Sequence, residues 1–190
     1  AEEAKIQQEK ADKKQSEAIS ERMEIAKDQQ KILEEAIAEA ANRNAVIGLK
    51  TTDSARQMSV MVKVDGKTGE TIRQSPVTVI RGRTIIPVDA DGDEMFMAIA
   101  GDNTANGTVK LCLLDKTNME IQKESKETVS EYSVLVNEGD SYYCVVTSDG
   151  NYNVAKYDSN LKLLLRSPDY VTPETPITIT SKGIIVTSSK

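Results

Sequence analysis

The sequence predicts a mainly β domain preceded by one α-helix, and two observations on composition lead to this prediction. All ten Gly, all five Pro and all seven aromatic residues of the 190-residue chain lie after Asn44. The residues before that point are mostly Ala, Glu, Gln and Lys, which are strong helix formers. The residues after it form short Val-, Ile-, Thr- and Tyr-rich runs separated by Asp-Gly and Asn-Gly turn pairs. We therefore predict a helical segment, residues 1–44, and a β-domain, residues 45–190.

The predicted helix carries eleven acidic and eight basic side chains and one apolar seam. Ile19, Met23, Leu33 and Ile37 lie on alternating spacings of four and three residues, with polar Gln30 between them, which is the seam of a coiled coil. Residues 1–17 contain one large apolar residue, so that part should bury little. We expect residues 1–44 to be the end of a helical stalk or a coiled coil.

A hairpin pattern occurs three times in the β-domain, within residues 62–76, 111–125 and 154–168. Each copy reads as a strand, an Asp, a turn, a second strand and a Ser. The period of about 45 residues, with several strands per unit, is typical of β-propellers. Residues 77–86 also resemble residues 177–186, and the runs 95–100 and 142–147 read as further strands.

The repeat predicts a propeller-like domain of three four-stranded units. The domain opens with half a unit, continues with two whole units and closes with half a unit, so we expect residues 177–186 to complete the sheet that residues 60–75 begin. Most propellers have at least four blades. The alternatives are a small three-unit ring, a six-unit ring made by two chains, or a β-trefoil-like pseudo-threefold fold.

Composition excludes several classes of function. The chain has no His and only two Cys, so it can make neither a Ser-His-Asp triad nor a four-cysteine zinc site. Its net charge of −6, without a basic block, gives no electrostatic footprint for nucleic acid. No apolar run is long enough to span a membrane, and the chain does not start like a signal peptide. We expect no cofactor and no direct membrane span.

One stretch has the residue types of a metal site. Asp89, Asp91 and Asp93 alternate as the first oxygen ligands of a calcium loop do. However, Glu94 and Ala100 stand where such a loop needs Gly and a bidentate Glu. We therefore favour an acidic hairpin with a tight turn at Asp91-Gly92 over a calcium site.

The candidate partner-binding residues are one basic spot and a group of tyrosines. Arg81 and Arg83 could bind an anion or a partner's carboxylate, or form a solvated turn. Tyr132, Tyr142 and Tyr152 are of the residue type favoured at interfaces, although alternation along a strand also places such residues in the core. Cys112 and Cys144 lie in apolar runs, where two buried thiols are favoured over a disulfide.

The arrangement of a charged helix followed by Gly48-Leu-Lys-Thr51, Val62-Lys-Val-Asp65-Gly-Lys-Thr-Gly-Glu70 and Ile80-Arg-Gly-Arg-Thr-Ile-Ile-Pro87 is similar to a known family. It resembles the C-terminal region of the high-molecular-weight envelope antigen of Lyme borreliae and its treponemal relatives. The resemblance implies a cell-envelope, periplasmic or secreted protein with no established enzymatic activity.

From these observations we expect a non-enzymatic interaction or scaffold domain that binds a protein or an extracellular-matrix partner. A homodimer formed through the helix or the β-units fits the same reading. The alternative is a hydrolase or lyase that acts on a glycan with two carboxylates, which would need a pocket that moves their pKa values apart.

Overall fold

The structure is a computed structural model that describes residues 2–104 and 107–189, with side chains from Lys13 onward. It contains two compact units, which we describe separately: Ala1–Ala45 with Asp65–Glu70, and Val46–Val64 with Thr71–Lys190. We refer to the second as the β-unit.

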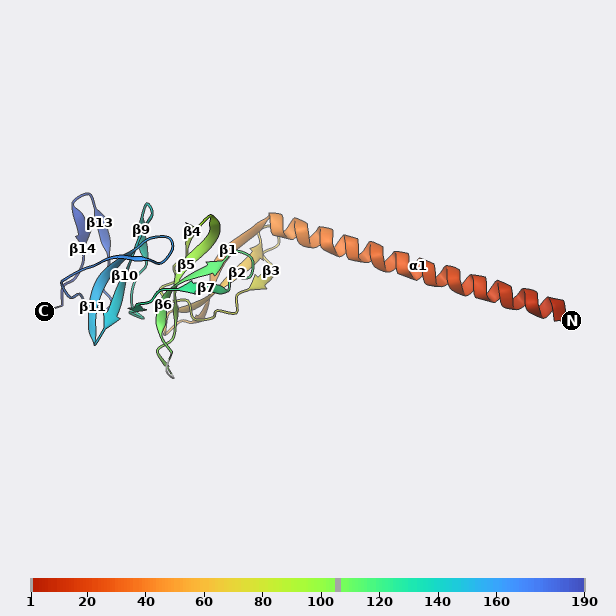
Figure 1. Cartoon of the computed structure of the whole chain (residues 1–190), viewed down its shortest axis with the longest axis horizontal. Helices are drawn as coiled ribbons and strands as arrows, with labels where there is room; N and C mark the ends of the chain where they lie inside the picture. The colour runs from red at the N-terminus through yellow and green to blue at the C-terminus, as the bar shows by residue number, and fades with distance from the viewer. Residues whose placement is uncertain (1, 105–106, 190) are drawn as a thin grey trace. The chain divides into compact units, whose positions relative to one another are not determined.

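The first unit contains the predicted helix, α1 (Glu2–Arg43) (Figure 1). Asn44 caps its C-terminus, because the Asn44 side-chain amide donates a hydrogen bond of 3.0 Å to the Ala40 carbonyl. The seam residues Ile19, Met23, Leu33 and Ile37 are all more than half exposed. The helix prediction is therefore confirmed.

The β-strands form four antiparallel groups, of which the first two are joined by isolated bridges from Ile80 to Ser59 of β2 and to Ala100 of β5 (Figure 1). Their order is β1-β2-β3 in the first sheet, β4-β5-β6-β7 in the second, β12-β11-β10-β8 with β9 also on β10 in the third, and β13-β14 in the last. The strands are β1 (Ala45–Asp53), β2 (Met58–Asp65), β3 (Thr71–Gln74), β4 (Ile86–Ala90), β5 (Asp93–Gly101), β6 (Val109–Asp115), β7 (Ile121–Glu124), β8 (Thr128–Val129), β9 (Val136–Glu138), β10 (Ser141–Ser148), β11 (Asn151–Tyr157), β12 (Leu163–Arg166), β13 (Thr178–Thr180) and β14 (Gly183–Ile185).

Alternate residues of the second sheet enter two different apolar cores. Met97 and Leu111 lie in a core shared with the third sheet, whereas Ala98 and Cys112 lie in a core shared with Met61 of the first sheet. Side chains on neighbouring strand positions point to opposite faces, so both faces of the second sheet are covered. The first three sheets therefore pack as successive layers.

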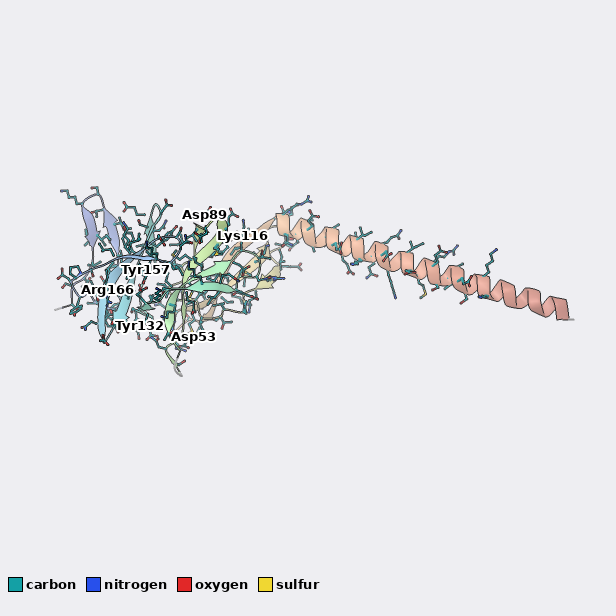
Figure 2. The ribbon with its side chains drawn as sticks, in the orientation of Figure 1. Asp53, Asp89, Lys116, Tyr132, Tyr157 and Arg166 are labelled. Atoms are coloured by element: carbon teal, nitrogen blue, oxygen red, sulfur yellow. The ribbon has the colours of Figure 1, made fainter. Side chains whose placement is uncertain are left out.

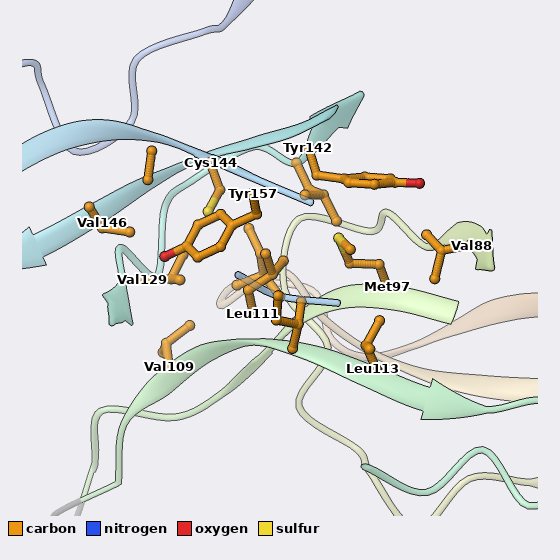
Figure 3. Close-up of a cluster of buried hydrophobic side chains, with 14 of the residues drawn as sticks. Val88, Met97, Val109, Leu111, Leu113, Val129, Tyr142, Cys144, Val146 and Tyr157 are labelled. Atoms are coloured by element: carbon orange, nitrogen blue, oxygen red, sulfur yellow. The ribbon is translucent and has the colours of Figure 1, made fainter. Parts of the chain in front are cut away.

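The core between the second and third sheets is the largest of the β-unit. It joins Leu111 and Leu113 of β6 to Tyr142 and Cys144 of β10 and to Tyr157 of β11. Figure 3 shows the Cys144 thiol and the Tyr157 ring side by side in this core. The Tyr157 hydroxyl donates a 2.9 Å hydrogen bond to Glu127, and burial raises the pKa of Tyr157.

The other face of the third sheet is covered by the chain that follows β12. Tyr143, Val145 and Val154 of this face share a core with Ile177 and with the partly buried Ile179 of β13. The β13-β14 hairpin is therefore the fourth layer of the stack, and it has two strands where the second sheet has four.

The three predicted Asp-turn-Ser hairpins are present and share their local hydrogen bonds. Each Asp side chain accepts from at least two backbone N–H groups of its own turn: Asp65 from Lys67 and Thr68, Asp115 from Thr117, Asn118 and Glu120, and Asp158 from Asn160 and Lys162. Each Ser donates its N–H across the hairpin: Ser75 to Met61, Ser125 to Leu111, and Ser167 to Val154. The Asp and the Ser therefore fix the two ends of each hairpin.

The prediction of a closed domain of three four-stranded units is wrong. The described sheets have three, four, five and two strands, none is closed, and β13-β14 pairs with neither β2 nor β3. The reason is β1, which was not predicted and which occupies the side of β2 where the C-terminal strand would have to pair. A mainly β-fold with one N-terminal helix is what remains of the prediction.

The proposed similarity of residues 77–86 to residues 177–186 is also not matched in the structure. Residues 177–186 contain the β13-β14 hairpin, whereas residues 77–85 form an irregular connection in which Ile80 alone makes isolated bridges, to Ser59 and Ala100. The predicted strands at 95–100 and 142–147 are confirmed as parts of β5 and β10.

Candidate partner-binding site

An apolar groove of about 380 Å³ lies between the third sheet and the β13-β14 hairpin. We call it the β14 groove. Its lining is Tyr143, Val154, Lys156, Leu165, Ser167, Pro168, Gly183, Ile184 and Val186. It contains residues of β14 but none of β13, so β14 is the strand of the hairpin that borders it.

The strand register explains the floor of the groove. Tyr143 of β10 pairs with Lys156 of β11, and Lys156 pairs with Leu165 of β12, so these three side chains form one row across the same face of the sheet. Ile184 of β14 pairs with Ile179, which packs on that face, so Ile184 points toward the same side of the hairpin. The face of the third sheet is therefore the floor of the β14 groove, and the β13-β14 hairpin is its wall.

The edge strand β12 differs from the edge strands of the other two hairpins. Arg73 of β3 and Lys123 of β7 occupy the register position that Leu165 has in β12. Charged residues protect exposed strand edges against unwanted pairing. At this position β12 has no charged residue, and its Leu164 and Leu165 are 49% and 58% exposed.

Lys156 is the charged residue in the lining of the groove. Its ammonium lies 5.8 Å from the centre of the Tyr143 ring, an arrangement in which the ring face attracts the cation. Within the described residues no carboxylate is within ion-pair distance of it. The groove thus offers apolar surface together with one positive charge.

The acidic stretch forms the predicted turn. Asp91 and Gly92 both have positive φ, 56° and 91°, and they join β4 to β5 directly, as in a two-residue hairpin turn. Asp89 accepts a 2.8 Å hydrogen bond from the Gly92 N–H, and Asp91 accepts one of 2.8 Å from Asn160. Asp93 is exposed. Nowhere in the described ranges do three or more Asp, Glu, Cys or His side chains gather to hold a metal ion.

Asp89 lines a second cleft, of about 510 Å³, together with Glu94, Lys116, Asp140 and Tyr142 (Figure 2 shows Asp89 and Lys116). The Lys116 ammonium forms an ion pair with Glu94 and lowers the pKa of that carboxyl group. Burial raises the pKa of Tyr142. This cleft brings acidic groups together on a partly apolar surface.

Arg81 is not a solvated turn residue, and it is not free to bind a partner. It is 3% exposed, its Nε donates a 2.9 Å hydrogen bond to the Gly101 carbonyl, and its guanidinium lies 3.3 Å from Asp102 and 3.4 Å from Glu131. A buried guanidinium needs such partners, which lie in other parts of the chain. Arg83 is exposed, as a turn residue should be.

The three candidate tyrosines do not form one surface. Tyr132 is 63% exposed and lines a small pocket of about 170 Å³, well apart from Asp89 (Figure 2). Tyr142 is buried except where it borders the 510 Å³ cleft, and Tyr152 packs, half-buried, against the core under the β13-β14 hairpin. None of them lines the β14 groove.

One feature of the sequence, the leucine run at residues 163–165, could have predicted the β14 groove. The three aligned hairpins show Arg73 and Lys123 where the third has Leu165 within the run Leu163-Leu-Leu165. The other two hairpins have a charged residue at this position of their edge strands. A run of leucines there in the third hairpin therefore indicates a surface that another part of a protein covers. Ile184 and Val186 gave no such signal, because only the folded hairpin brings them to Leu165.

The cysteines are both free and buried, as favoured from their apolar surroundings. Burial raises the pKa of Cys112 to about 12, and it also raises the pKa of Cys144. Burial therefore disfavours the reactive thiolate form of both cysteines in the folded β-unit.

The chain was compared with known protein families, curated proteins and solved structures. No curated protein and no solved structure matches the chain. No helix within the described residues has both the length and the apolar character to span a membrane. The family model described as Borrelia P83/100 protein matches residues 1–177, which is most of the chain and agrees with the antigen family that the sequence resembles. The chain therefore belongs to the Borrelia P83/100 protein family.

Proposed function

We propose that the chain is a non-enzymatic interaction module of a cell-envelope protein and that it binds a protein or matrix partner through the β14 groove. The observation that supports this proposal most is the exposed apolar surface of Leu165, in the floor of the groove, and of Ile184, in its wall. Monomeric proteins rarely expose large contiguous apolar patches, so such a patch is typical of an interaction site. The family assignment supports the envelope location.

Paired variants test this function. Leu165→Lys changes the groove, whereas Leu164→Lys changes a neighbouring leucine of similar exposure that does not line it. We expect saturable binding to solubilised Borrelia envelope proteins or to an extracellular-matrix preparation, weakened by Leu165→Lys and unchanged by Leu164→Lys. Equal binding by both variants, at unchanged melting temperature, would rule out the groove.

The alternative function is a carboxylate-dependent hydrolase or lyase that acts on a glycan. The observation in its favour is the 510 Å³ cleft, which contains Asp89, Glu94 and Asp140. A general acid needs a raised pKa, yet the ion pair with Lys116 lowers the pKa of Glu94, one of the carboxyl groups that line this cleft. We therefore propose that the cleft has no catalytic role.

An assay of glycan cleavage decides between the two functions. We expect no release of reducing ends or unsaturated products by the purified chain. Release that Asp89→Asn or Asp140→Asn abolishes would establish the enzymatic function instead.

We also propose that the exposed seam of α1 binds another helix, either a second copy of this chain or a further helical segment. The support is that Ile19, Met23, Leu33 and Ile37 are exposed in the single chain although their spacing is that of a coiled coil.

A further inference from the structure

The geometry points to a strand-addition site: an extended segment of a partner protein, apolar at alternate positions and carrying a carboxylate, pairs with β14 and fills the β14 groove. This inference rests on the proposed interaction function and deepens it, because it states how the partner binds and what chemistry the partner has.

The first support is the order of strands in the stacked layers. In the second sheet the hairpin β4-β5 continues with β6 beside β5, and in the third sheet β11 lies beside β10. In the fourth layer, β14 pairs with β13 alone among the described strands. The position next to β14 is thus the position that a third strand takes in the two preceding layers.

The second support is that the groove lies at this position. It is bordered by Gly183, Ile184 and Val186 on the side of β14, and its floor is the row Tyr143, Lys156 and Leu165. A strand beside β14 would place every second side chain on that floor. Strand addition of this kind takes its affinity from main-chain hydrogen bonds and its specificity from the pockets for alternate side chains.

The third support is charge. The apolar lining requires apolar side chains from the occupant, and the Lys156 ammonium, which faces an aromatic ring and no carboxylate of the described chain, favours a negative charge. An ion pair that forms at an apolar surface gains more than one in open water. A second copy of this chain is the competing occupant, and the experiment separates it from a partner.

The experiment selects short peptides from a random display library on the full chain, with counter-selection on Leu165→Lys. We expect the enriched peptides to alternate apolar residues and to contain Asp or Glu. Lys156→Glu should weaken their binding about tenfold, as loss of a close ion pair does. Peptides in which that acid is replaced by Lys should regain binding to Lys156→Glu.

Hydrogen exchange gives the readout that side-chain docking alone would not change. Backbone amides of residues 183–186 should gain protection when a selected peptide binds. Leu164 is a neighbouring leucine that does not line the groove, so the control variant Leu164→Lys should bind the peptide as the wild type does. The fold should accept Leu165→Lys because Arg73 and Lys123 take the same register position in the other hairpins, and an unchanged melting temperature verifies this.

Three outcomes would overturn the inference. They are no enrichment over Leu165→Lys, peptide binding without protection of residues 183–186, and a doubled mass in light scattering that Leu165→Lys reduces to monomer. If binding to envelope or matrix proteins still depends on Leu165 in any of these cases, the proposed function stands and only strand addition fails. If that binding is also insensitive to Leu165, both fail.

Discussion

At the scale of single residues, Arg81 is a buried arginine whose guanidinium contacts three separate parts of the β-unit. Its guanidinium contacts the Arg56 carbonyl between β1 and β2, Asp102 at the end of β5 and Glu131 between β8 and β9. These partners belong to the first, second and third layers. One buried cation therefore ties three layers together at one end of the sheets.

Arg81→Ala should lower the free energy of unfolding by about 2–3 kcal/mol, because it leaves Glu131 without a cation, Asp102 with Arg56 alone, and two carbonyls without a side-chain donor. Urea denaturation of the purified chain measures the effect. The matched control is Arg83→Ala, an exposed arginine two positions away, which should change stability by less than about 0.5 kcal/mol. Similar losses in both variants would show that Arg81 does not hold the layers.

Asp102 gives stability a specific dependence on pH. The hydrogen bond from Arg56 lowers the pKa of Asp102 to about 2. A carboxyl group whose pKa is lower in the folded state stabilises the fold above its unfolded pKa, and that contribution is lost as the pH falls toward the folded value. The wild type should therefore lose its stability advantage over Asp102→Asn between about pH 4 and pH 2.

The urea midpoint, measured against pH for both proteins, checks this prediction. The same comparison in an Arg56→Gln background is the second part of the test. Without Arg56, a chain with Asp102 should be less stable relative to the same chain with Asp102→Asn, at neutral pH as well as at low pH. A gap between wild type and Asp102→Asn that stays constant down to pH 2 would contradict it.

At the scale of elements, the three hairpins show how one carboxylate specifies a turn. The Asp115 carboxylate accepts from Thr117, Asn118 and Glu120 N–H groups and from the Gln122 side chain. Although burial raises the pKa of Asp115, the three backbone N–H donors together lower it. Asp65 accepts only two such bonds.

Asp115→Ala should therefore cost about 2 kcal/mol of stability, and Asp65→Ala about 1 kcal/mol, since hydrogen bonds to charged groups stabilise more than neutral ones. Thermal unfolding of the two variants, compared with wild type, tests the order of the effects. The reverse order would mean that the number of turn hydrogen bonds does not determine hairpin stability.

The helix is the element whose apolar side chains remain most exposed. Because Leu33 and Ile37 are 60% and 61% exposed, the double variant Leu33→Ser and Ile37→Ser removes little apolar burial within a single chain. We expect the melting temperature of the β-unit to stay unchanged. Light scattering on the same samples shows whether a helix partner is lost, as a fall in mass, and a lower melting temperature of the β-unit would contradict the expectation.

At the scale of the whole β-unit, the layers are held by separate cores. Ile177 is 7% exposed in the core under the β13-β14 hairpin. Ile177→Ala should lower stability by about 2–4 kcal/mol, and hydrogen exchange should rise in β10, β11 and β13 and much less in β2 and β6. Ile185→Ala, at an exposed position of the same hairpin, is the control and should have little effect.

The sequence was sufficient for features that depend on neighbouring residues. The absence of Gly and Pro before Asn44 predicted α1, and the Asp and Ser pairs predicted the hairpins. It was insufficient for β1, since Ala45–Asp53 contains a central Gly and its strand conformation depends on pairing with β2. The burial of Arg81 and the β14 groove were missed for the same reason, because they depend on residues far apart in the chain.

The position of the two cysteines gives the chain two internal reporters of unfolding. Cys112 lies in the core between the first and second layers, and Cys144 lies in the core between the second and third. A brief pulse of an alkylating reagent during unfolding would label each thiol only when its own core opens. Mass spectrometry of the two labelled peptides would then give the order in which the layers separate, without any engineered probe.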